Sequence, residues 1–122
     1  MAGQPKSEPI EVWLVEPGEI RAAFTFDSQP LEYLPADAPL PNVGDLILLP
    51  RNVTSDAEEQ AFAYRGRLAP FEVVEREHVY YRKRHERLDP TNLKPARYVK
   101  TVISVRRLTE QQFYEDRGWR SE

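Results

Sequence analysis

The chain of 122 residues has no cysteine, one methionine and five glycines. The lack of cysteine excludes disulfides, thiolate metal sites and cysteine nucleophiles. The longest apolar run, residues 46–49, is far too short to cross a membrane. Residues 1–9 lack the apolar segment of a signal peptide. We therefore expect a cytoplasmic protein that contacts no membrane and holds no cofactor or metal.

Proline is abundant where glycine is scarce. Five of the eleven prolines fall within residues 30–50, and proline is excluded from helix interiors and central strands. We expect a disordered N-terminal tail over residues 1–9 and one β-rich domain over residues 10–122. Within this domain, residues 27–42 form a Pro-rich connector whose leucines and tyrosine hold it against the body.

Short runs of β-branched and aromatic residues predict most of the secondary structure. Residues 10–15 and 19–26 are expected to form a hairpin around Pro17-Gly18. Three further strands are expected at residues 46–49 (buried on both faces), 71–83 (with a bulge or an edge position near Arg76) and 97–108. Residues 51–61 are expected to be a loop, despite a weak capping box at Ser55. Residues 110–117 should be a short helix opened by the capping-box spacing at Thr109.

The order of these elements predicts a mainly β protein, built as a small antiparallel β-barrel or curled sheet with a short C-terminal helix. The segment from VGDLILLP to FEVVEREHVYY resembles small SH3-like or PUA-like barrels, in which a Gly-Asp turn precedes a buried strand. The resemblance covers about a third of the chain. It implies an architecture and no activity, because such barrels host many functions.

Acidic and basic residues are concentrated in different halves of the chain. Residues 1–60 contain eleven Asp/Glu and three Lys/Arg, for a net charge of −8, and residues 61–122 contain nine and fourteen, for +5. The sum is the net charge of −3 of the whole chain. Such asymmetry indicates either an anionic partner or the packing of one half against the other.

The basic half contains a segment with the composition of a single-stranded nucleic-acid site. Its rings could stack on bases while its cations neutralise phosphates. The acidic pI of about 5.5 argues against this interpretation. The candidate contact residues, for nucleic acid or for another partner, are Tyr80, Tyr81, Arg82, Lys83, Arg84, Arg87 and Lys100, together with Trp119, which lies between arginines near the C-terminus.

Two other interpretations account for the same charges. Acidic and basic strands that are neighbours in the sheet would pair within one molecule. If they are not neighbours, an acidic face of one molecule would meet a basic face of another, giving a homo-oligomer or a docking surface for a different protein.

A third class of site involves Glu75, Glu77 and His78. In a strand the two glutamates share a face and His78 points away, which is a poor arrangement for a metal ion or for acid–base catalysis. The sequence contains no phosphate-binding glycine loop and no GxSxG or HExxH motif. We therefore expect a non-enzymatic module that binds a protein partner or a second copy of itself through complementary charge and a sheet edge. Single-stranded nucleic-acid binding is the first alternative, and an enzyme or ligand-binding site near residues 75–78 is the second.

Overall fold

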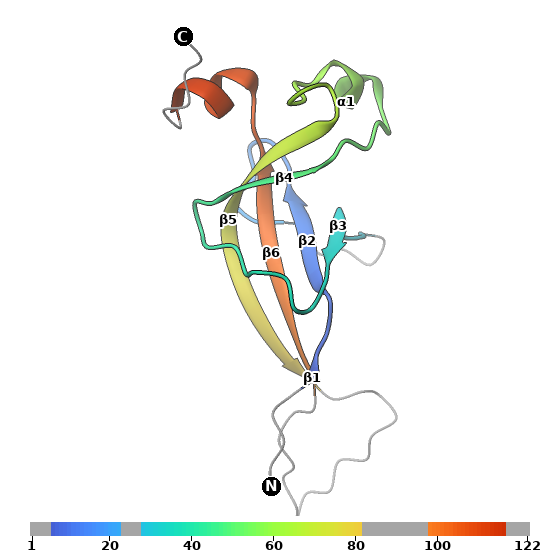
Figure 1. Ribbon diagram of the computed structural model, residues 1–122, viewed down its shortest axis with the longest axis vertical. Coiled ribbons are helices and arrows are strands. Elements are labelled where there is room, and N and C mark those ends of the chain that lie inside the picture. Colours follow the sequence, from blue (N-terminus) through green and yellow to red (C-terminus); the bar gives the residue numbers. More distant parts are fainter. Residues whose placement is uncertain (1–5, 23–27, 82–97, 117–122) are drawn as a thin grey trace, which may run out of the picture.

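The structure is a computed structural model that describes residues 6–22, 28–81 and 98–116 (Figure 1). Within these residues six strands form one mixed sheet in the order β3-β2-β6-β5-β4, and β1 pairs with the start of β6. The elements are β1 (Lys6–Ser7), β2 (Ile10–Val15), β3 (Glu32–Leu34), β4 (Leu46–Pro50), the helix α1 (Asp56–Gln60), β5 (Leu68–Tyr81), β6 (Tyr98–Arg107) and a π-helix (Gln112–Asp116).

The two longest strands, β5 and β6, form the antiparallel centre of the sheet, and β4 turns across the front of them in Figure 1. The sheet thus curls, which confirms the expectation of a small, mainly β, curled-sheet fold. A register shift between Val73 and Glu75 marks a bulge at Val74, close to the position predicted near Arg76. The bulge reverses the alternation, so that Val73 faces the core and Glu75 turns to the opposite face.

The pairing partner of residues 10–15 differs from the prediction. β2 pairs antiparallel with β3 on one side and parallel with β6 on the other. Residues 19–22 form no strand and contain only a bend at residues 20–21, instead of the expected returning strand, because both edges of β2 are already occupied. The rest of that predicted strand, residues 23–26, lies outside the described residues. Two of the sheet's pairings, β2–β6 and β1–β6, are therefore parallel rather than antiparallel.

Lys6 and Ser7, within the expected N-terminal tail, form the short strand β1. β1 pairs parallel with residues 98–99 of β6, and the Glu8 amide donates to the Val99 carbonyl at 2.9 Å. A polar sequence forms a strand here because β6 offers it backbone partners, which composition cannot show. Residues 1–5 lie outside the described residues.

The core fills the concave side of the sheet. Val12, Val73 and Ile103 are fully buried and come from the three central strands. Around them lie Ile10, Leu49, Ala69, Phe71 and Val105, and the connector adds Leu31 and Ala38. The connector crosses this side of the sheet, and Arg76 fixes it by donating to the Pro41 carbonyl at 3.2 Å and to Asn42 Oδ1 at 3.0 Å.

Two short elements close the upper end in Figure 1. The loop expected over residues 51–61 contains α1, whose N-cap Ser55 accepts a hydrogen bond from the Glu58 amide at 3.2 Å. The predicted C-terminal helix is present as the π-helix. Its capping box is formed, since the Gln112 amide donates to Thr109 Oγ1 at 3.2 Å. Phe113 is 1% exposed and packs among Phe62, Tyr64 and Tyr114.

Candidate functional site

The predicted contact segment is described only in part. Tyr80, Tyr81 and Lys100 lie at the lower ends of β5 and β6 in Figure 1. The other predicted contact residues, Arg82, Lys83, Arg84, Arg87 and Trp119, lie outside the described residues.

Lys100 is paired within the chain. Its Nζ lies 3.1 Å from Glu11 Oε2, and the other carboxylate oxygen of Glu11 accepts a hydrogen bond from Trp13 Nε1 at 2.9 Å. The Lys100 and Glu11 side chains are 33% and 16% exposed. The parallel pairing of β2 with β6 produces this contact by placing Glu11 beside Val102, two residues from Lys100 on the same face. The charge of Lys100 is thus largely balanced by the acidic half of the chain.

The two tyrosines have different surroundings. Tyr81 stacks on Tyr98 with ring centroids 5.5 Å apart, and its hydroxyl donates to Glu8 Oε1 at 3.0 Å. Desolvation of the hydroxyl and the adjacent Glu8 carboxylate raise the pKa of Tyr81 above its ordinary value. Tyr80, on the opposite face of β5, is 63% exposed. Of these two rings, only that of Tyr80 is open to stacking by a ligand.

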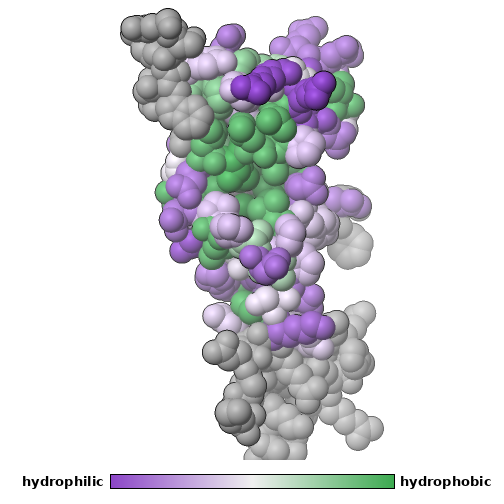
Figure 2. All heavy atoms as spheres, viewed as in Figure 1, coloured by the Kyte–Doolittle hydropathy of each residue, from purple (hydrophilic) through white to green (hydrophobic). Residues whose placement is uncertain are grey.

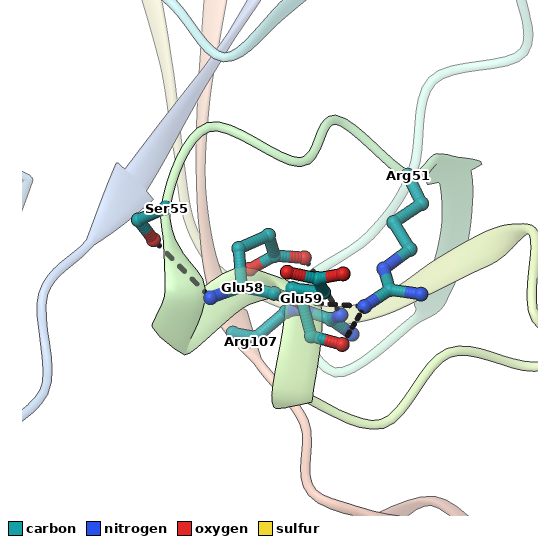
Figure 3. Close-up of polar contacts among 5 residues, drawn as sticks. All are labelled: Arg51, Ser55, Glu58, Glu59 and Arg107. Atoms are coloured by element: carbon teal, nitrogen blue, oxygen red, sulfur yellow. Dashed lines mark hydrogen bonds and ion pairs between the residues drawn. The ribbon is translucent and has the colours of Figure 1, made fainter.

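A second charge cluster lies under α1 (Figure 3). Arg107 Nη2 donates to Glu58 Oε1 at 2.9 Å, with side chains 18% and 25% exposed. Arg51 Nη2 donates to the backbone carbonyls of Glu58 (2.8 Å) and Glu59 at the C-terminal end of the helix, where the Glu58 carbonyl also accepts from the Ala61 amide at 3.2 Å. The Arg107 guanidinium also lies over the Phe71 ring, 5.5 Å from its centroid.

These ion pairs connect the two halves of the chain. Glu11–Lys100 and Glu58–Arg107 each join an acidic residue of the first half to a cation of the second, and Arg21–Glu75, at 3.9 Å, joins the halves in the opposite sense. Part of the charge asymmetry is therefore balanced inside the molecule, as one of the sequence interpretations expected.

The third predicted group, Glu75, Glu77 and His78, does not converge. The register places Glu75 and Glu77 on one face of β5 and His78 on the other, where His78 Nδ1 lies 3.0 Å from Thr101 Oγ1. No group of three or more His, Cys, Asp or Glu that could hold a metal ion occurs among residues 6–22, 28–81 and 98–116.

A surface that the sequence analysis did not single out lies along β4 and its flanks. Residues 38–53, which we call the apolar strip, contain only two charged residues, although 30% of the whole chain is charged. The strip exposes Leu40, Val43 and Val53 (36%, 63% and 52%). Leu46, Ile47 and Leu48 of β4 are half-buried rather than buried on both faces as predicted, because β4 is an edge strand.

The two charged side chains of the strip, Asp45 and Arg51, are both engaged in contacts within the chain. Asp45 Oδ2 accepts from the Asn42 amide at 2.8 Å, and Arg51 reaches α1. Figure 2 shows apolar side chains gathered over the middle of this face, with polar side chains around them. The sequence does contain a feature that could have indicated this surface. Residues 38–53 carry only two charges, although their prolines are otherwise typical of a connector.

Comparison with known proteins does not assign the chain to a family. No family model, curated protein or solved structure matches the chain. Within the described residues, no helix is long and apolar enough to cross a membrane.

Proposed function

We propose that the protein is a non-enzymatic binding module that docks another polypeptide on the apolar strip. The observation that carries this proposal is the exposure of Leu40, Val43 and Val53 around a charge-free edge strand. Charge depletion and clustered apolar side chains, surrounded by polar ones, are typical of the centre of a protein–protein interface. An open strand edge adds backbone groups that can pair with a partner.

Complementary charge has a smaller role in this proposal than the sequence indicated. Three ion pairs within the chain already engage Glu11, Glu58, Glu75 and their cations. Charges at the rim of the strip would affect the rate of association more than its strength.

The proposal is tested by capture from a lysate of the source cells, with quantification of retained proteins by mass spectrometry. Val43→Asp and Val53→Asp each place a charge on the strip, and Ile20→Asp places one at an equally accessible residue outside it, which is 85% exposed. We expect at least one protein that wild type and Ile20→Asp retain equally, and whose retention falls about tenfold or more with the strip variants. Retention that is indifferent to all three substitutions would overturn the proposal.

Single-stranded nucleic-acid binding is the second candidate, favoured by the 63% exposure of Tyr80 next to the basic segment of residues 82–87. The capture variants separate the two candidates. Nucleic-acid binding would become the favoured function if two results were obtained together. Capture would be unaffected by the strip variants, and a labelled oligonucleotide would bind in a salt-sensitive way that Tyr80→Ala weakens.

A further inference from the structure

The backbone of β4 presents hydrogen-bonding groups away from its only strand neighbour. Arg51 donates its amide to Arg67 at 2.8 Å, and Asp45 accepts from the Val73 amide at 3.0 Å, so residues 45 and 51 are directed toward β5. Because this direction alternates along an antiparallel strand, Ile47 and Leu49 also face β5. The amides and carbonyls of Leu46 and Leu48 therefore point outward.

This edge lacks the features that normally prevent pairing with other strands. β4 carries no charged side chain, its register with β5 is continuous, and its proline stands at the last position. The opposite edge of the sheet, β3, is shorter and contains Glu32. Within the described residues no strand pairs with the outer side of β4.

The sequence of β4 is complementary to itself in an antiparallel arrangement. With a two-fold axis at Ile47, Leu46 lies opposite the partner's Leu48, and both residues have outward amides and carbonyls, so each such pair exchanges hydrogen bonds in both directions. Ile47 meets the partner's Ile47, so every side-chain pair at the centre is apolar.

The ends of the strand fit the same register. Gly44 falls opposite the partner's Pro50, which has no amide to donate. A Cβ built on Gly44 meets no described atom within 4 Å, so the side-chain position of Gly44 is unobstructed. The Gly44 amide already donates to the Val73 carbonyl at 2.7 Å, so intermolecular pairing ends at this position.

From these observations we infer that β4 pairs with β4 of a second copy of this chain, antiparallel about Ile47. The inference rests on the proposed function, since it names the occupant of part of the apolar strip. A five-residue edge buries less than the ~1,000 Å² of a stable interface, so the dimer is weak and forms at high protein concentration.

The test is sedimentation equilibrium from about 10 µM to about 1 mM, a range that suits an interface of this size. The mass of wild type should rise toward twice that of the monomer, whereas Leu48→Pro should remain monomeric. This proline removes an outward amide and leaves the β4–β5 hydrogen bonds in place. Ile20→Pro, outside both the strand and the apolar strip, is the control and should dimerise like wild type. If Leu48→Pro does not fold by circular dichroism, Leu48→Lys and Ile20→Lys replace the pair.

Amide exchange measured by NMR provides a site-specific readout. Protection of the Leu46 and Leu48 amides should rise at least tenfold between the lowest and highest concentrations, while that of Ile47 and Leu49 stays constant. A dimer that persists in both Leu48 variants would overturn the inference. A wild-type monomer at 1 mM, with strip-dependent capture retained, would overturn the second copy as occupant and leave the proposed function intact. If wild type neither dimerises nor shows strip-dependent capture, both the inferred dimer and the proposed function are overturned.

Discussion

At the scale of single residues, the arginines under α1 have more donors than partners. Among the described residues, Arg51 Nε and both Nε and Nη1 of Arg107 are buried without a hydrogen-bond acceptor. A buried guanidinium with unpaired donors depends strongly on the partners that it does have. For Arg107 these are the Glu58 carboxylate and the Phe71 ring. The cluster therefore fixes α1 against the ends of β4 and β6.

This dependence predicts unequal effects at two adjacent glutamates. Glu58→Ala removes the carboxylate that Arg107 contacts and should lower the free energy of unfolding by about 1–3 kcal/mol. Glu59→Ala is the matched control, because Arg51 contacts only the backbone carbonyl of Glu59, and it should change stability by less than about 0.5 kcal/mol. Urea denaturation measures both, and equal losses would contradict the role given to the Glu58 side chain.

The Tyr81 hydroxyl predicts a loss of stability at alkaline pH. Its pKa is raised above 10.0 in the folded protein, so the neutral phenol is favoured there and the unfolded chain ionises first. The resulting stabilisation is fully present below pH 10 and is lost as the pH rises through the folded pKa. The urea midpoint of wild type should therefore fall more steeply above pH 10 than that of Tyr81→Phe.

Tyr33→Phe, which removes a hydroxyl from a 56% exposed ring on β3, controls for the loss of one phenol. It should retain the wild-type slope of urea midpoint against pH. Identical slopes in wild type and Tyr81→Phe would show that folding does not raise the pKa of Tyr81.

At the scale of elements, local pattern predicted those strands whose alternation is long. β6 (Tyr98–Arg107) lies within the predicted range 97–108. β5 contains a bulge near the position where a bulge or an edge was predicted, because Glu75 and Glu77 fall in the phase of the apolar residues. The helix cap at Thr109 was predictable because its hydrogen bonds are formed within four residues.

Elements that depend on distant residues were not predictable. α1 is only five residues long and is held by Arg51 and Arg107, which lie outside it in the sequence. The alternation of β2 shows that it is a strand but not that its neighbour is β6, about ninety residues away. For the same reason, the sequence did not predict that Lys100 pairs with Glu11. It therefore did not show that one cation of the predicted contact segment already has a partner within the chain.

At the scale of the whole molecule, the first and last long strands meet in the middle of the sheet. β2 lies between β3 and β6, and β6 lies between β2 and β5. Val12 and Ile103 are adjacent across this pairing, and both are fully buried. The core is therefore complete only when both ends of the chain are in place, which favours cooperative unfolding of the described sheet.

A double-mutant cycle at this pairing tests that cooperativity. Ile103→Ala should lower the free energy of unfolding by about 2–5 kcal/mol, because it leaves a cavity at the centre of the core. The double variant with Val12→Ala should differ from the sum of the single changes by about 0.5 kcal/mol or more, since the two side chains share one packed region. Pairing Ile103→Ala instead with Tyr114→Ala, in the aromatic cluster at the upper end, should give additive losses. Additivity in both cycles would mean that the two ends of the chain contribute independently to the core.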